Sequence, residues 1–456
     1  MFIGREKELN RLNQLYNDTN FQFVVMFGRR RIGKTEILKE FSKNKNVIFY
    51  SAIEKQNNLE DFSKTILSHF NESENLSINT WQSALEYISN HSSNKIVLII
   101  DEFPYIAKVE PYVKSIFQHT IDHIWKDKNI MLILCGSSVS FMVNGVMGRK
   151  SPLYGRNTSV MEVLPFDYDM VDKFLPNYTK EEQLITYGIL GGVPYYLSKF
   201  SKNKSLLENI ANTIIDSSSQ LKEEPITLLK AELREPMTYN EILEAIANGA
   251  TKLTEIADKT HIAPNKLPVY LKSLIEMRII DKIICAGEKK NSKKSQYIIK
   301  DNFFAFWYRF VFANQTKIDF MEAIDYVKSI KNNIQEYMGF KFENICYQYL
   351  KKEAKKGNLP FIPSTLGKWW RTNPSTKKPD DIDILGIDQK NYLFCECKFK
   401  NEKFDLKELN NLINISSTFK NAESKYYYIF IKSSFSSSVI QEAQKYNIKL
   451  ITINDM

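Results

Sequence analysis

An eight-residue segment rich in glycine and arginine constrains the fold of this chain more than any other feature. Residues 28–35 read Gly-Arg-Arg-Arg-Ile-Gly-Lys-Thr; they follow an apolar run at residues 23–27 and precede a helix-compatible stretch at residues 36–41. A buried strand, a glycine loop and a helix N-terminus in this order direct backbone N–H groups and the helix dipole at a phosphate group. The segment therefore predicts an α/β core whose phosphate loop binds a nucleoside triphosphate.

The residues of this loop have distinct predicted tasks. Lys34 should reach the β and γ phosphates, and the hydroxyl of Thr35 should bind Mg²⁺. The loop residues predicted to contact ATP are Gly28, Arg29, Arg30, Arg31, Ile32, Gly33, Lys34 and Thr35. The expected cofactors are thus ATP and Mg²⁺.

A second apolar strand ends in two carboxylates, as ATP hydrolysis requires. Residues 96–100 are all apolar, which is typical of a parallel strand buried on both faces, and Asp101 and Glu102 follow them. Asp101 is predicted to coordinate Mg²⁺, and Glu102 to polarise the attacking water as the catalytic base. Together with the loop, this strand predicts an ATPase.

Two further segments supply candidates for sensing the nucleotide. The apolar strand at residues 130–135 ends near Ser137, which could contact the γ phosphate, with Ser138 as the alternative. Arg156 lies in a glycine-bounded loop, from which a guanidinium could neutralise transition-state charge within one chain or across the boundary of a homo-oligomer. A plain surface arginine is the other interpretation of Arg156.

These segments, together with Phe-Ile-Gly-Arg-Glu at residues 2–6 and Gly-Gly-Val-Pro at residues 191–194, resemble the archaeal-type ATPase family, a branch of the STAND class of AAA+-related NTPases. The resemblance covers residues 1–225. It implies that Gly4 and Arg5 lie against the nucleotide base and that Pro194 belongs to a helical lid that helps to sense the nucleotide. A simple turn between two helices would explain the Gly-Gly-Val-Pro segment equally well.

The pattern between residues 236 and 300 is that of a winged helix-turn-helix. Three short amphipathic helices are predicted, the last of which carries Lys266, Tyr270 and Lys272 on an exposed face, and a strand follows at residues 279–284. Four lysines at the predicted hairpin tip, residues 288–294, could lie over a phosphate backbone. Double-stranded DNA is the partner expected for this module; an intramolecular spacer is the alternative.

The C-terminal part carries a second group of candidate catalytic residues. Two strands are predicted at residues 378–385 and 392–398, and Glu396 and Lys398 share one strand face while Asp383 could converge with them. Two carboxylates can hold Mg²⁺ while the lysine steadies water or a developing phosphate charge. This arrangement indicates a metal-dependent nuclease.

The same residues resemble the PD-(D/E)xK nuclease superfamily, and the C-terminal part is similar to the restriction-endonuclease-like α/β domain often fused to archaeal-type ATPases. The resemblance adds Glu343 as an acid on a helix, which would bind the metal with Asp383 and Glu396. Asp380 and Asp381 compete with Asp383 for the first acidic role. Cleavage and a retained fold without activity both stay open.

Length and composition agree with several domains. With 456 residues, 43% of them hydrophobic, the chain has room for about three domains of typical size. The expected order is a P-loop ATPase core at 1–160, a helical lid at 161–228, a winged helix-turn-helix at 229–300, an aromatic helical connector at 301–335, and a nuclease-like domain at 336–456.

The net charge and the cysteine content limit which partners and which cellular compartment can be expected. Lys and Arg number 62 against 53 Asp and Glu, and the net charge of +9 permits a nucleic-acid partner. No apolar run approaches the roughly 18 residues of a membrane span, so we expect a cytoplasmic protein without a membrane partner. The five cysteines indicate reduced thiols, and Cys395 and Cys397 lack the second ligand pair of a zinc site.

Two functions follow as hypotheses. In the first, ATP binding and hydrolysis drive a multidomain switch that positions DNA for binding or Mg²⁺-dependent cleavage by the C-terminal domain. In the second, the protein is a non-cleaving ATP-dependent DNA-binding regulator or scaffold with an inactive nuclease-like tail.

Overall fold

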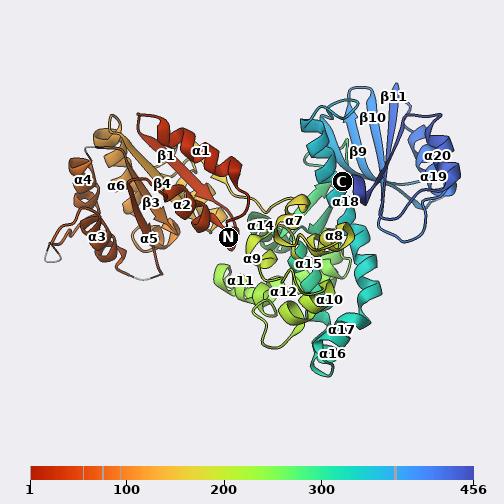
Figure 1. The fold of residues 1–456 in the computed structure, drawn as a ribbon, viewed down its shortest axis with the longest axis horizontal. Coiled ribbons are helices and arrows are strands. Elements are labelled where there is room, and N and C mark those ends of the chain that lie inside the picture. The colour runs from red at the N-terminus through yellow and green to blue at the C-terminus, as the bar shows by residue number, and fades with distance from the viewer. Residues whose placement is uncertain (1, 55, 74–75, 93, 374–376) are drawn as a thin grey trace. The chain divides into compact units, whose positions relative to one another are not determined.

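The computed structural model describes residues 2–54, 56–73, 76–92, 94–373 and 377–456. The chain forms two compact units (Figure 1). Unit 1 contains the residues up to Pro165 together with Val193–Tyr195, and unit 2 contains Phe166–Gly192 and Tyr196–Met456.

Unit 1 is built on a parallel five-stranded sheet in the order β2-β3-β4-β1-β5. Its strands are β1 (Gln22–Phe27), β2 (Val47–Ser51), β3 (Ile96–Asp101), β4 (Ile130–Gly136) and β5 (Ser159–Glu162). Every residue of β1, β3 and β4 is buried, as the apolar runs predict for parallel strands covered on both faces. The order places β4 between β1 and β3, so the ends of these three strands meet at one edge of the sheet.

Helices cover both faces of this sheet. They are α1 (Glu6–Asn17), α2 (Lys34–Ser42), α3 (Asn58–His69), α4 (Trp81–His91), α5 (Phe103–Val109) and α6 (Val113–Thr120), with π-helical turns η1 (Ile121–Trp125) and η2 (Phe141–Val146). Helices α3, α4 and α6 lie on one face and α1 and α2 on the other (Figure 1). The alternate side chains Phe23 and Val25 of β1 enter the core under α3 to α6.

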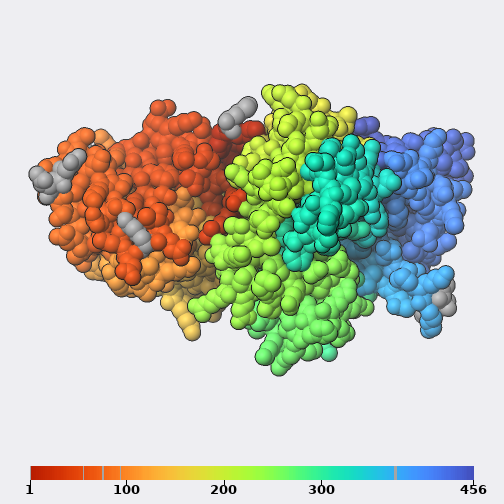
Figure 2. Space-filling model, turned by 90° about the horizontal axis from the view of Figure 1, so that it is seen from below, coloured from red at the N-terminus to blue at the C-terminus, as the bar shows by residue number. Residues whose placement is uncertain are grey.

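The first part of unit 2 is helical. It contains η3 (Tyr168–Met170), α7 (Val171–Phe174), α8 (Lys180–Leu190), α9 (Pro194–Leu197, which begins in unit 1), α10 (Leu206–Ile210), η4 (Ala211–Ile215), α11 (Glu224–Glu232), α15 (Asn302–Phe310), η5 (Phe312–Asn314), α16 (Gln315–Asp319), α17 (Ala323–Ser329) and α18 (Lys331–Lys355). Helix α8 packs between α15 and α18. The aromatic segment predicted as a connector forms α15, in which Phe303, Phe306 and Trp307 are fully buried. Helix α17, coloured teal, lies on the outside against α10 and η4 (Figure 2).

Three helices and a hairpin occupy the segment predicted to form the winged module. They are α12 (Pro236–Ala247), α13 (Leu253–Thr260), α14 (Leu267–Glu276), β6 (Ile280–Ile284) and β7 (Ser295–Ile299). The two strands pair antiparallel as a separate two-stranded sheet. The loop between them is docked: the N–H of Ala286 donates to the carbonyl of Lys368 at 2.8 Å, and the Cys285 sulfur contacts the backbone of Trp370 at 3.4 Å.

The C-terminal part of unit 2 is a mixed five-stranded sheet in the order β12-β11-β10-β9-β8. The elements are β8 (Thr365–Thr372), β9 (Pro379–Asp388), β10 (Asn391–Lys398), α19 (Leu406–Ser417), β11 (Ser424–Ile431), α20 (Ser437–Ala443), β12 (Ile448–Thr452) and η6 (Ile453–Asp455). Strands β8, β9 and β10 pair antiparallel, whereas β10, β11 and β12 pair parallel. Helix α18 lies on one face, and α19 and α20 lie on the other (Figure 1).

Candidate functional site

The phosphate loop joins β1 to α2 and is held in a tight conformation. Gly33, the N-cap of α2, has φ 90°, a left-handed conformation that glycine adopts at no steric cost. A Cβ on Gly28 would lie 2.4 Å from the carbonyl oxygen of Val163, so only glycine fits there. The buried Lys34 ammonium donates to the carbonyls of Gly28 and Arg29 at 2.9 and 3.1 Å. The loop thus forms a tight turn against which the Lys34 ammonium lies, and its binding of phosphate stays a prediction.

The two acids at the end of β3 lie next to polar partners. The Thr35 hydroxyl donates to Asp101 at 2.6 Å, and Asp101 is 1% exposed. Glu102 accepts two hydrogen bonds on one oxygen, from the Ser137 N–H at 3.0 Å and the Ser137 hydroxyl at 2.8 Å. The structure thus brings together four of the predicted residues, and it places Ser137, which follows the middle strand β4, beside the predicted base.

The N-terminal segment reaches the back of the loop through one buried arginine. The guanidinium of Arg5 donates to the carbonyl of Ile32 at 3.0 Å and to that of Leu164 at 2.8 Å, and it pairs with Glu8 at 3.1 Å. Burial lowers the pKa of Arg5, while Glu8 favours its charged form. Gly4 and Arg5 both adopt positive φ, at 68° and 73°. Arg5 therefore holds the loop backbone in place.

The other arginines of the loop contact tyrosine side chains. Arg30 donates to the Tyr105 hydroxyl at 3.2 Å, and the Arg31 guanidinium lies over the Tyr195 ring at 4.4 Å from its centre. Pro194 lies near the loop, since a Cβ built on Gly33 would be 4.0 Å from its ring. The two tyrosines carry no motif in the sequence, and only the adjacency of Tyr195 to Pro194 could have pointed to one of them.

Arg156 makes a local ion pair. Its guanidinium binds both carboxylate oxygens of Asp122, at 2.8 and 2.7 Å, and also donates to the carbonyls of Pro152 and Tyr154. The hydrogen bond from Arg156 keeps the pKa of Asp122 below its usual value. Every nitrogen of this guanidinium thus has a partner within its own unit.

The C-terminal residues Asp383, Glu396 and Lys398 also meet. The Lys398 ammonium is 2.5 Å from Glu396 and 4.0 Å from Asp383. Asp383 is 8% exposed and accepts the N–H of Cys397 at 2.8 Å. Asp380 instead pairs with Arg371 at 3.0 Å and accepts from Asn373, and Asp381 is exposed. Of the three competing aspartates, Asp383 is therefore the one that contacts Lys398.

Glu343 of α18 joins this cluster through a lysine that the sequence analysis missed. Lys368 of β8 donates to both oxygens of Glu343, at 2.9 and 2.8 Å. Burial and the charge of Asp383 raise the pKa of Glu343 to about 7, and the same two causes raise the pKa of Glu396 to about 7. Only the position of Lys368 in a strand next to Trp369 could have pointed to it.

The residues predicted to contact DNA, and the cysteines, are placed as follows. Lys266, the N-cap of α14, and Lys272 within it are exposed, whereas the Tyr270 hydroxyl donates to Glu235 at 2.9 Å. Lys289, Lys290 and Lys293 are exposed at the hairpin tip, and Lys294 pairs with Glu288 at 3.6 Å. All five cysteines are free and buried.

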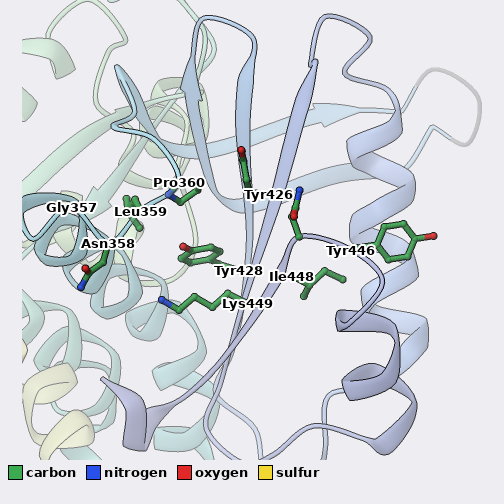
Figure 3. A pocket seen from close by; sticks show the side chains of 10 residues that line it. Gly357, Asn358, Leu359, Pro360, Tyr426, Tyr428, Tyr446, Ile448 and Lys449 are labelled. Atoms are coloured by element: carbon green, nitrogen blue, oxygen red, sulfur yellow. The ribbon is translucent and has the colours of Figure 1, made fainter.

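In the described part of the chain, no group of three or more His, Cys, Asp or Glu side chains is arranged to hold a metal ion, and this includes the predicted ligands Glu343, Asp383 and Glu396. No helix among the described residues is long and apolar enough to span a bilayer. A hollow of about 380 Å³ at the β11–β12 edge is lined by tyrosines and Lys449, without a carboxylate among its described residues; Tyr428 and Lys449 extend toward the loop with Asn358, whereas Tyr446 points away (Figure 3).

Comparison with known families identifies two regions of the chain. Residues 2–200 match a family described as an ATPase domain predominantly from Archaea, and residues 307–410 match a family of archaeal and bacterial proteins of unknown function. The first match covers the phosphate loop, the acids of β3, Ser137 and Pro194. The protein is accordingly an ATPase with an ATP-binding domain.

Similar proteins extend this result over most of the chain. An uncharacterized protein of Methanocaldococcus jannaschii is 36% identical over 405 residues, which cover 88% of each protein. An uncharacterized ATP-binding protein of Pyrococcus abyssi is 25% identical over 289 residues, or 54% of this chain and 88% of that protein.

A solved structure shares the fold. The Walker-type ATPase of Pyrococcus abyssi superposes with a TM-score of 0.52 at 21% identity, over 68% of this chain and 96% of that one. The identity with the Methanocaldococcus protein extends over nearly the whole of both chains, so this protein belongs to the same family, and its N-terminal domain is an archaeal-type ATPase domain.

Proposed function

We propose that this ATPase is a nucleotide-driven switch that acts on DNA and that its C-terminal cluster is a Mg²⁺-dependent phosphodiesterase site. The observation that carries the proposal is the meeting of Asp383 and Glu396 with Lys398, with Glu343 close enough for the charge of Asp383 to raise its pKa. Burying like charges together disfavours the folded state, which is why clusters of this kind with displaced pKa values concentrate at functional sites. A divalent cation would offset the repulsion, and Asp383 and Glu396 would supply the carboxylate oxygens that Mg²⁺ prefers. Glu343 would have to leave Lys368 to become a third ligand.

The nucleotide site fits ATP and Mg²⁺ by the chemistry of its donors. Gly28 leaves no room for a side chain, and Lys34 is a buried cation whose present partners are loop carbonyls, so a phosphate group can replace them. Thr35 and Asp101 would hold Mg²⁺, which neutralises charge on the phosphates when bound. The remaining loop residues, with Gly4 and Pro194, would surround the nucleotide, and Arg5 would support the loop from behind.

Glu102 and Ser137 would activate the water molecule that attacks the γ phosphate. In our proposal Glu102 orients a water molecule and accepts its proton, and Ser137 fixes the carboxylate by the two hydrogen bonds described above. Arg156 would have to exchange Asp122 for the phosphates to act as a charge-neutralising arginine, within one chain or in a homo-oligomer. The exposed Lys266, at the N-cap of α14, and Lys272, within α14, would contact double-stranded DNA, as in a winged helix-turn-helix.

A second function, a regulator that binds DNA without cutting it, is favoured by one specific observation. Lys368 and Lys398 already neutralise Glu343 and Glu396 by close ion pairs. Two lysines against three carboxylates can stabilise the cluster without a metal, as a structural ion-pair network does. The two functions make opposite predictions for cleavage.

The test is cleavage of supercoiled, linear and single-stranded DNA by the full chain with Mg²⁺ or Mn²⁺, with and without ATP. We expect cleavage by the native protein and by Asp380→Asn, whose side chain pairs outside the cluster, and none by Asp383→Ala or Glu396→Ala. All variants should still bind ATP. Absence of cleavage by the native protein, with DNA bound equally by all variants, would support the regulator instead.

A further inference from the structure

A cleft of about 580 Å³ in unit 2 opens onto the acidic cluster. Glu343, Lys368 and Asp383 are part of its lining, and its walls come from α18, from the β6–β7 hairpin and from β8 and β9. The docking of Ala286 and Cys285 on β8 fixes the hairpin beside this sheet. The cleft is therefore a formed feature of this unit.

One side of α18 lines the cleft with aromatic and basic side chains. Phe340, Tyr347, Lys351 and Lys355 line it and follow one another at seven, four and four positions, which places them in a stripe along one side of a helix. Phe340 is 65% exposed, although large aromatic rings are usually buried in a soluble protein. An aromatic ring thus lies at one end of the stripe and two lysines at the other.

The lysines of this stripe are available to an anion. Lys351 and Lys355 are exposed, and neither has an ion pair with a carboxylate among the described residues. The Lys351 ammonium lies over the Tyr347 ring, 5.8 Å from its centre. Their neighbour Lys352 differs, because it pairs with Asp169 at 2.5 Å. Lys300, at the end of β7, also lines the cleft but pairs with Asp281 at 3.0 Å.

We infer that the cleft binds a single strand of nucleic acid, with phosphates on Lys351 and Lys355 and bases against Phe340 and Tyr347, and leads it to the acidic cluster. Basic grooves with exposed aromatic rings are how proteins hold unpaired strands. A duplex keeps its bases stacked on one another, so its bases cannot stack on Phe340. A cleft of about 580 Å³ is moreover of the size that holds small ligands rather than a double helix. The inference rests on the proposed function, because it names the substrate strand of the same site.

The test is fluorescence anisotropy with a labelled oligothymidylate and a labelled blunt duplex, in EDTA so that no strand is cut. Lys351→Ala/Lys355→Ala should weaken oligothymidylate binding about tenfold, and should reduce the dependence of log K on log salt by about 1.4, since each single-strand phosphate contact contributes about 0.7. Phe340→Ala should weaken it about tenfold as well. Duplex binding should stay unchanged in both variants.

The matched control is Lys403→Ala/Lys407→Ala, which removes two exposed lysines with the same spacing from another part of the same sheet domain. It should leave both affinities unchanged. Equal oligothymidylate binding by the native protein and the Lys351/Lys355 variant would overturn the inference, as would equal weakening of single-strand and duplex binding.

Cleavage in Mn²⁺ separates this inference from the proposed function. Cleavage that needs Glu396 but is indifferent to Lys351 and Lys355 would overturn the strand-binding cleft and leave the nuclease. Lysine-dependent strand binding without cleavage would overturn the nuclease and leave the cleft.

Discussion

Glu102 illustrates how one backbone conformation positions a reactive side chain. It follows β3 and caps α5 with φ 53°, a left-handed conformation that is uncommon outside glycine. Its carboxylate thereby turns toward Ser137 at the end of β4, while Asp101 remains in the strand beside Thr35. Strain of this kind persists where the surrounding structure holds it, and it is concentrated at active sites.

The first prediction separates catalysis from binding in the ATPase. Glu102→Gln keeps the size and an acceptor for Ser137 but removes the base, so the turnover number should fall about 10²- to 10⁴-fold while ATP affinity is kept. Lys34→Ala should instead weaken ATP binding about tenfold or more, because it removes a charge-assisted phosphate contact. Phosphate release and nucleotide titration measure the two effects. Unchanged turnover in Glu102→Gln would contradict the assigned base.

The second prediction concerns the two possible tasks of Arg156. If it neutralises charge during hydrolysis, Arg156→Ala should lower the turnover number at least tenfold, whereas Asp122→Asn, which breaks the same ion pair, should not. If it only braces its loop, both variants should keep turnover and lose similar stability, about 0.5–1 kcal/mol for a partly exposed pair. Turnover and melting temperature of the two variants distinguish these outcomes.

At the scale of elements, helices α8 and α18 are packed closely enough to move together. Gly188 of α8 lies against α18: the Tyr337 hydroxyl donates to its carbonyl at 2.9 Å, and a Cβ there would lie 2.2 Å from the Met338 sulfur. Glu181 of the same helix pairs with the buried Lys432 at 2.8 Å. Helix α18 also carries Glu343, so α8 packs on the helix that contributes to the acidic cluster.

The third prediction tests this packing with two glycines on facing helices. Gly188→Ala should destabilise the protein by about 1–3 kcal/mol, since the buried Met338 must move to admit a methyl group. Gly339→Ala, on α18 with no atom within 4 Å of the new Cβ, should stabilise by about 0.5–1 kcal/mol through helix propensity. Melting temperatures should therefore shift in opposite directions. A shift of the same sign in both variants would contradict the close contact.

What could be predicted from the sequence depends on how local the signal is. The phosphate loop, the acids after β3 and the alternation around Glu396 are contained in short segments, and the strands β1, β3 and β4 lie within two residues of their predicted ends. Lys368 and Ala286 belong to no recognisable motif, and their partners, Glu343 and Lys368, lie far from them in the sequence. Their contacts follow from tertiary packing, which leaves no periodicity or motif in a single sequence.

At the scale of the whole molecule, the chain passes from one unit to the other more than once. It crosses after Pro165, after Gly192 and after Tyr195. The first two crossings begin or end in unit 2 at Phe166 and Gly192. These two residues are hydrogen-bonded to each other, since the N–H of Phe166 donates to the carbonyl of Gly192 at 2.8 Å. Pro194 lies between the crossing after Gly192 and the crossing after Tyr195, and its ring is near Gly33. Helix α8 leads directly into this segment, so one continuous stretch of chain connects the nucleotide site with the packing around Glu343.

The fourth prediction follows from that connection and from thermodynamic reciprocity. If the protein is a switch, ATP should change its affinity for DNA by about 5- to 150-fold, and DNA must change its affinity for ATP by the same factor. The Glu102→Gln variant allows both titrations to be made at equilibrium, because it should hydrolyse its bound ATP only slowly. Anisotropy of labelled DNA with and without ATP, and of labelled ATP with and without DNA, measures the two factors. Factors of one in both directions would mean that the units bind their ligands independently, and the proposal of a nucleotide-driven switch would then fail even if each unit is active.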